Sequence, residues 1–108
     1  MKRIKSKKIT QSAKGKSCTL RIPNVCKDNP ETTVGAHING AGMGYKSHDP
    51  LIAYSCSECH HWLDKGYVDM DLTYYTERDI KRAIRDSEQL RGINETFPQL
   101  YEQGLIKL

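Results

Sequence analysis

The hydrophobic residues in the first half of the chain occur in short runs. Residues 34–38 (VGAHI) and 51–54 (LIAY) are two such runs, and their length is typical of buried strands. Residues 17–27 (SCTLRIPNVCK) are also strand-like, with a turn predicted at Pro23-Asn24. Two further stretches, the polar residues 28–33 (DNPETT) and the glycine-rich residues 39–50 (NGAGMGYKSHDP), predict a turn and a loop.

The second half of the chain predicts helices. Residues 60–65 begin a helix directly after a Cys-x-x-Cys pair, and Gly66 ends it. An amphipathic helix is predicted over residues 73–91, where apolar and small residues recur at helical spacing between charged ones. That apolar face consists of Ile80, Ala83, Ile84, Ser87 and Leu90. Gly92 and Asn94 weaken the helix, and Pro98 predicts a kink or a second short helix that Gly104 ends. Residues 105–108 are compatible with a short strand.

Small β elements followed by helices predict a small α+β domain. The 108 residues fit one domain. Hydrophobic residues make up 37% of the chain and charged residues 28%, so the core is thin and a bound metal would help to stabilise it. We therefore expect a single domain over residues 17–108, with a core motif at residues 17–66 and a helical part at residues 71–104.

Basic residues are concentrated at the start of the chain. Residues 1–27 contain nine lysines and arginines and no acidic residue, and the net charge of the whole chain is +4. Residues 1–16 therefore predict a flexible basic arm that suits a polyanion, most simply nucleic acid. A solvated tail that only aids solubility is the alternative. The candidate nucleic-acid contacts are Lys5, Lys7, Lys8, Lys14 and Lys16, together with Lys46 in the glycine-rich loop.

Whether the cysteines form disulfides or bind a metal depends on the cellular compartment. The basic start is not followed by an apolar leader segment, and no apolar run approaches the length of a membrane span. We therefore expect a cytoplasmic protein, where structural disulfides are uncommon and metal-bound thiolates are favoured. Two disulfides among the four cysteines are the alternative.

Two cysteine pairs could together make a metal centre. Cys56-x2-Cys59 is a tight knuckle, and Cys18-x7-Cys26 is a wider pair that the Pro-Asn turn can fold back. Four thiolates are enough for a closed tetrahedral zinc. The alternative for Cys18 and Cys26 is that they are ordinary buried small hydrophobic residues.

The residues after the knuckle offer further ligands. His60 and Asp64 are four positions apart on the predicted helix, so they lie on one face and could hold a second metal. His61 points elsewhere, by about 100° of helical rotation. It is expected to be a surface residue or a phosphate contact.

The segments GAHI, HDPLIAY and CSECHHWLD, in this order, resemble the ββα-metal, or HNH, endonuclease motif. The likeness is closer to a group of small phage and prophage proteins, the Ref-type recombination-associated nucleases. That group is matched here by CTLRIPNVC, by the dipeptide Ala36-His37, by AGMGYKSHDPLI, by CSECHHWLD and by the ending EQGLIKL. The resemblance covers residues 17–64 and the last few residues, but not the basic arm.

The resemblance implies a ββα-metal, treble-clef-like fold and a role for each matching residue. His37 would be the general base and Asp49 would brace it, while His60 and Asp64 would hold a catalytic cation such as Mg²⁺ or Mn²⁺. The four cysteines (Cys18, Cys26, Cys56 and Cys59) would hold a structural zinc. The chain departs from the family at Ala36, where most members have a metal-binding Asp or His; the missing ligand would come from His48, Asp49 or the substrate phosphate.

The hypothesis that follows is a metal-dependent HNH endonuclease that hydrolyses DNA, encoded by a phage or prophage and acting in the bacterial cytoplasm. By resemblance its partners would be DNA and a recombinase filament, with no membrane or small-molecule substrate. The alternative is a zinc-stapled nucleic-acid-binding module without catalysis. A third possibility is an adaptor protein, which predicts an apolar stripe left exposed near residues 80–90.

Overall fold

A computed structural model describes residues 4–38, 47–69 and 78–107 of the chain. These residues form a small α+β fold, as the sequence predicts, with one antiparallel hairpin and three α-helices. The elements are α1 (Lys7–Gln11), the 3₁₀ helix η1 (Pro30–Thr32), β1 (Val34–His37), β2 (Ile52–Ser55), α2 (Ser57–Asp64), the 3₁₀ helix η2 (Gly66–Asp69) and α3 (Arg78–Glu102).

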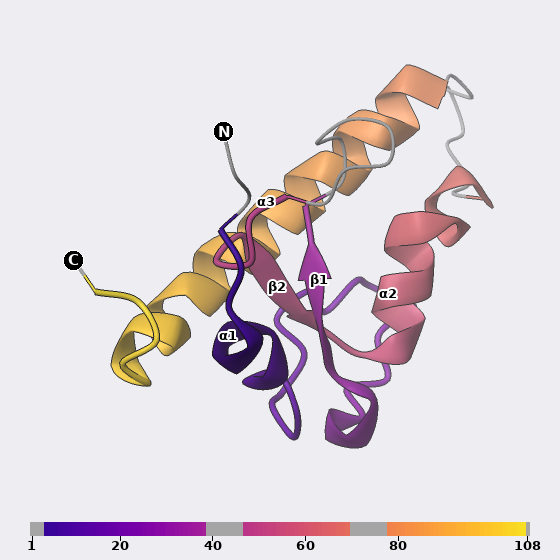
Figure 1. The fold of residues 1–108 in the computed structure, drawn as a ribbon. Coiled ribbons are helices and arrows are strands. Elements are labelled where there is room, and N and C mark those ends of the chain that lie inside the picture. Colours follow the sequence, from indigo (N-terminus) through magenta and orange to yellow (C-terminus); the bar gives the residue numbers. More distant parts are fainter. Residues whose placement is uncertain (1–3, 39–46, 70–77, 108) are drawn as a thin grey trace.

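The hairpin sets the positions of both candidate sites. Its register pairs Val34 with Ser55 and His37 with Ile52. His37 therefore lies at the end of the hairpin where the connection between the strands begins, whereas Cys56 follows directly from the opposite end. In Figure 1, α2 and α1 lie on either side of the hairpin and the long α3 runs behind it, in contact with β2.

Two hydrophobic clusters fill the space around the hairpin. The larger cluster lies between residues 17–27 (the first cysteine segment), the hairpin, α2 and α3. The smaller one lies between α1, β2 and the end of α3. The larger consists of Cys18, Leu20, Ile22, Ala36, Ala53, Cys56, Cys59, Trp62, Leu63, Tyr67 and Ile93. The smaller consists of Ile9, Ala13, Ile52, Tyr54 and Leu100.

Part of the segment expected to be a flexible arm is packed against the domain. The hydroxyl of Ser6 caps α1 by accepting a hydrogen bond from the Ile9 N–H. Ile9 and Ala13, four positions apart on one side of the segment, are buried in the smaller cluster. Residues 4–16 of the segment expected to be a flexible arm thus include a short helix and two buried apolar side chains.

Residues 17–27 form a looped segment and not the expected strand. Its backbone contacts β2 at Thr19 and Leu20, whose N–H groups donate to the carbonyl of Tyr54 at 2.8 and 3.4 Å. Beyond these residues the backbone turns through left-handed conformations at Arg21, Asn24 and Asp28, which have φ values of 43°, 64° and 43°. These turns, which include the predicted Pro23-Asn24 turn, bend the chain around the cysteines.

The C-terminal helix differs from its prediction in length and in its buried face. α3 continues through Gly92, Asn94 and Pro98 as one helix, and no strand follows it in residues 105–107. Asn94 and Pro98 are both exposed, so water can satisfy the carbonyl that loses its partner to proline. The buried residues are Gln89, Gly92, Ile93, Thr96 and Leu100, whereas Leu90 is 62% exposed.

Gly92 allows this helix to lie directly on the hairpin. A Cβ atom at this position would lie 2.7 Å from the Leu20 Cδ2 atom and 3.0 Å from the Ala53 Cβ atom. The absence of a side chain thus sets the distance between α3, β2 and the first cysteine segment.

We expect Gly92→Val to destabilise the fold by about 1–3 kcal/mol, because the new side chain overpacks this contact. A domain of this size loses about 4–8 °C of melting temperature per kcal/mol, which thermal unfolding followed by circular dichroism detects. Ser87→Val adds a β-branched side chain at an exposed position of the same helix and serves as the control. Equal melting temperatures for the two variants would contradict the close-contact role of Gly92.

Candidate metal centre and histidine–aspartate pair

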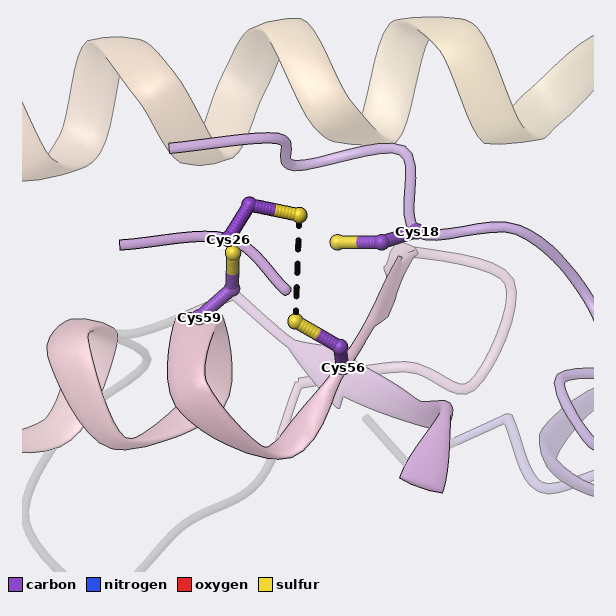
Figure 2. A group of neighbouring side chains, drawn as sticks. All are labelled: Cys18, Cys26, Cys56 and Cys59. Atoms are coloured by element: carbon purple, nitrogen blue, oxygen red, sulfur yellow. Dashed lines mark hydrogen bonds between the residues drawn. The ribbon is translucent and has the colours of Figure 1, made fainter. Parts of the chain in front are cut away.

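The four cysteine sulfurs converge on one point beside the start of α2 (Figure 2). All four Sγ atoms lie within 4.8 Å of one another, and the Cys26 and Cys56 sulfurs are 3.9 Å apart. A tetrahedral zinc with bonds of about 2.3 Å to sulfur requires sulfur–sulfur distances of about 3.8 Å. None of the cysteines is in a disulfide. Both the geometry and the donor set therefore fit a metal ion such as zinc.

The looped segment and the start of α2 each supply two of these sulfurs. The Asp28 carboxylate accepts a hydrogen bond from the Cys18 N–H at 2.9 Å, which closes the loop between the first two cysteines. The Arg21 N–H points at the Cys18 sulfur at 3.4 Å. Cys56 and Cys59 lie at the N-cap and in the first turn of α2, so the helix fixes their separation.

The thiols of the cluster differ in pKa, so they do not lose their protons equally easily. A hydrogen bond from the Cys59 thiol stabilises the Cys18 thiolate and lowers the pKa of Cys18 to about 5. The same hydrogen bond raises the pKa of Cys59. Burial raises the pKa of Cys26 to about 11. A metal must therefore displace protons from this cluster when it binds.

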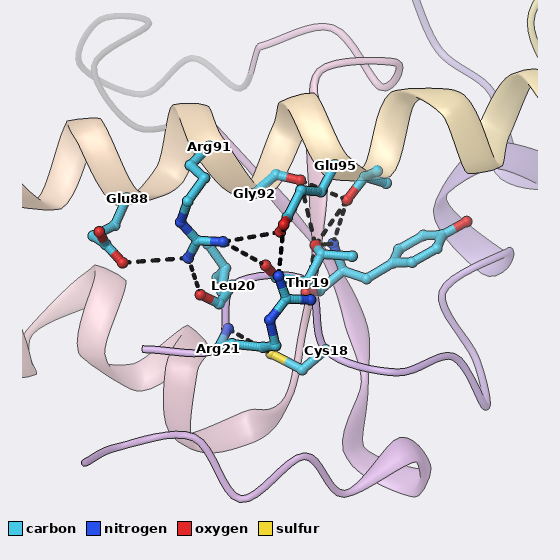
Figure 3. A network of polar contacts seen from close by, with 10 residues as sticks. Cys18, Thr19, Leu20, Arg21, Glu88, Arg91, Gly92 and Glu95 are labelled. Carbon is cyan, nitrogen blue, oxygen red and sulfur yellow. Dashed lines mark hydrogen bonds and ion pairs between the residues drawn. The ribbon is translucent and has the colours of Figure 1, made fainter. Parts of the chain in front are cut away.

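Arg91 of α3 fastens the first cysteine segment to the long helix (Figure 3). Its guanidinium donates to the carbonyl oxygens of Thr19 and Leu20 and pairs with Glu88 and Glu95 on its own helix. Sequence reasoning did not find this residue. Its partners lie 71 and 72 positions away in the chain, and a charged residue within a charged helix gives no local signal.

A buried hydroxyl pair strengthens the same junction. The Thr19 and Thr96 hydroxyls are 2.8 Å apart, and both accept from the Tyr54 N–H. These contacts satisfy the outer edge of β2, so the cysteine segment, the hairpin and α3 form one hydrogen-bonded unit.

The structure brings His37 and Asp49 together at the other end of the hairpin. The His37 Nε2 atom lies 2.7 Å from the Asp49 Oδ1 atom, and the two side chains are 20% and 6% exposed. A carboxylate can only accept, so Nε2 carries the proton in this contact, and Nδ1 is the acceptor nitrogen of the neutral imidazole. This arrangement suits a histidine that takes a proton from another group.

Ala36 is buried where most family members have a metal ligand, and the two residues considered as its replacement, His48 and Asp49, have hydrogen-bond partners of their own. Ala36 is 1% exposed and belongs to the larger hydrophobic cluster. His48 accepts a hydrogen bond at Nδ1 from the Ile4 N–H at 2.8 Å. The two Asp49 oxygens contact His37 and the Ser6 N–H.

The two residues predicted to hold a second metal, His60 and Asp64, lie on the surface of α2. The His60 Nδ1 and Asp64 Oδ2 atoms are 3.8 Å apart, and their side chains are 44% and 51% exposed. Among the residues that the structure describes, only the four cysteines form a group of three or more possible ligands within 4.8 Å. His37 is thus not gathered with His60 and Asp64 into one such group.

The candidate nucleic-acid contacts lie mainly on the N-terminal segment. Lys5, Lys7, Lys8 and Lys14 are exposed, and Lys16 is half-buried. Lys46 lies outside the described residues. Of the apolar stripe predicted for an adaptor, Leu90 is exposed whereas Ile80 and Ile84 are half-buried.

Fold and site together define a small α+β protein with a four-cysteine centre that could hold zinc and a histidine–aspartate pair at the far end of its hairpin. In the part of the chain that the structure describes, no helix has the length and hydrophobicity to span a membrane. The chain belongs to the family described as "Putative nuclease YbcO", which matches residues 7–95.

Relatives of the chain carry the same description. It is 41% identical over 70 residues to "Putative nuclease YbcO" of Escherichia coli strain K12, a match that covers 56% of this chain and 73% of that protein. The identity and coverage are the same for "Putative nuclease ybcO" of Enterobacteria phage 82. A solved structure described as a "putative bacteriophage protein" from E. coli K-12 MG1655 aligns with a TM-score of 0.62 and 29% identity, over 88% of this chain and 98% of that one.

Proposed function

We propose that this protein is a metal-dependent HNH-type endonuclease that hydrolyses DNA phosphodiester bonds, in a phage or prophage DNA-processing role. Its relatives are named as nucleases, one of them from a phage. The observation that carries the proposal is the 2.7 Å contact between His37 and Asp49, in a fold that also contains a four-cysteine centre. The basic N-terminal segment supports a polyanionic substrate.

The chemistry would begin at the free nitrogen of His37. Asp49 holds the Nε2–H, so Nδ1 takes the proton of a water molecule as its oxygen attacks phosphorus. The bond between phosphorus and the 3′ oxygen then breaks, and the leaving oxygen takes up a proton. General-base catalysis of this kind contributes about 10²–10⁴-fold to the rate. The exposed lysines would hold the phosphate backbone without reading its sequence.

A divalent cation would be held by His60 and Asp64, which offer a nitrogen and an oxygen ligand on an exposed face of α2. When bound, Mg²⁺ or Mn²⁺ supplies stabilisation of the charge that develops on the leaving oxygen.

The test is cleavage of supercoiled plasmid and of single-stranded DNA by the purified protein in Mg²⁺ or Mn²⁺. The proposal expects nicked, linear or shortened products that require the added cation. DNA binding without cleavage would favour the alternative, a zinc-stapled nucleic-acid-binding module, for which the four cysteines and the basic residues suffice.

Substitution at the proposed cation ligands tests their role directly. His60→Ala and Asp64→Asn are each expected to raise the Mg²⁺ concentration for half-maximal cleavage by about tenfold or more, because each removes a ligand. His61→Ala changes an exposed neighbour that faces elsewhere on the same helix and should leave the metal dependence unchanged. Metal titrations that superimpose for all four proteins would remove His60 and Asp64 from the site.

A further inference from the structure

The N-terminal segment at residues 4–6 is hydrogen-bonded to the part of the chain that carries Asp49. The Ser6 N–H donates to the Asp49 Oδ2 atom at 2.6 Å. The Asp49 N–H donates to the Ile4 carbonyl at 2.9 Å, and the Ile4 N–H donates to the His48 Nδ1 atom at 2.8 Å. Three hydrogen bonds thus join two segments that are more than 40 positions apart in sequence.

Two contacts use opposite oxygens of the Asp49 carboxylate. Oδ1 contacts His37 Nε2 and Oδ2 accepts from the Ser6 N–H. Two donors on opposite oxygens fix the rotation of a carboxylate more closely than one donor does. Because Asp49 is only 4% exposed, water competes little for either oxygen.

The Ser6 donor is itself held in place by the fold. Ser6 is the N-cap of α1, and Ile9 of that helix is buried against β2. The position of the Ser6 N–H is therefore tied to the packing of α1. In addition, the fully buried Gln89 of α3 donates to the main-chain carbonyl of His37 at 2.6 Å. The histidine is thus held through its side chain and its backbone.

We infer that residues 4–6 are an N-terminal clamp, and that the Ser6 backbone N–H is a positioning group that aligns His37 through Asp49. The inference rests on the proposed function, in which His37 is the base. The clamp acts on the orientation and tautomer of the imidazole and touches neither water nor phosphate. It gives the N-terminal segment a role besides the binding of nucleic acid.

Replacing one amide by an ester removes the Ser6 N–H and leaves every side chain in place. Because Cys18 is a natural ligation site, a synthetic peptide of residues 1–17 can be joined to residues 18–108. The ester at Ser6 is expected to lower kcat for plasmid cleavage by about 10- to 100-fold, with KM within about twofold, since small misplacements of a catalytic group have effects of this size. The controls are the all-amide ligated protein and an ester at Lys8, in the first turn of α1.

A second readout does not depend on cleavage. Nitrogen NMR of His37 in the all-amide protein is expected to show a protonated Nε2 and an unprotonated Nδ1. The Ser6 ester should shift this population toward the other tautomer, whereas the Lys8 ester should not. An unchanged tautomer population in the Ser6 ester, with unchanged kcat, would overturn the clamp. If the all-amide protein does not cleave DNA, the proposed function fails, and the tautomer measurement alone still decides on the clamp.

Discussion

Loss of zinc from the four-cysteine centre is expected to unfold the larger hydrophobic cluster. Three of the four cysteines that would hold it, Cys18, Cys56 and Cys59, are themselves buried members of that cluster. Structural zinc binds small domains with an apparent free energy of about 10–16 kcal/mol. A folded domain has a net stability of about 5–15 kcal/mol, so a zinc ion bound here would decide whether this fold persists. Circular dichroism and metal analysis during chelation measure both losses together.

Lowering the pH should also release the metal, as a chelator does. Burial raises the pKa of Cys26 to about 11, so in the metal-free protein this sulfur holds its proton at neutral pH. Protons compete for the sulfurs more strongly as the pH falls, and zinc affinity falls with it.

Cys56→Ser should have the same effect as chelation, whereas Ser57→Ala, at the exposed next position, serves as the control. A Cys56→Ser protein with unchanged zinc content and melting temperature would contradict the structural role of the centre.

Asp49→Asn is expected to reduce kcat by about 10²–10⁴-fold while the fold and the zinc content are retained. The amide can donate to His37 Nε2, which places the ring proton on Nδ1 and removes the lone pair that accepts a proton from water. Single-turnover cleavage of plasmid DNA measures the change at the chemical step.

The matched control for this substitution is Asp86→Asn, which removes the same charge from an exposed aspartate on α3. Its cleavage rate should equal that of the wild-type protein. If Asp49→Asn also cleaves at the wild-type rate, Asp49 does not set the tautomer of His37, and the base must be found elsewhere.

The elements that sequence reasoning found are those with local signals. Residues 34–38 and 51–54 are apolar runs between turn-forming stretches, and they contain β1 and β2. The helix predicted from residue 60 is α2, which begins earlier, at Ser57 within the Cys-x-x-Cys pair, and Gly104, with φ of 74°, follows the end of α3. Each depends on a residue type that favours one conformation regardless of its distant partners.

The misses depend on contacts between distant parts of the chain. In the sequence, Gly92 predicts a weak point in the helix. In the structure, its lack of a side chain allows α3 to lie on Ala53 and Leu20. The buried face of α3 is set by this contact, so it differs from the face that Leu90 marks in the local pattern. In the same way, the anchoring of α1 by Ile9 becomes visible only once β2 is in place.

In the candidate site too, the sequence indicates some residues and not the distant groups that hold them. His37 and Asp49 were predicted together through a family resemblance, and the structure puts their side chains in contact. The groups that hold them were missed: the Ser6 N–H lies 43 positions from Asp49, and Gln89 lies 52 positions from His37. A backbone N–H carries no residue signature, and a glutamine among charged residues of a helix resembles a solvent-facing residue.

The most direct test of the whole account is plasmid cleavage by the wild-type and His37→Ala proteins, compared at equal zinc content in Mg²⁺ or Mn²⁺. The account predicts cation-dependent cleavage by the wild-type protein and a loss of about 10²–10⁴-fold in the variant. Cleavage that persists unchanged in His37→Ala would contradict it, because the activity would then arise from another site or another protein.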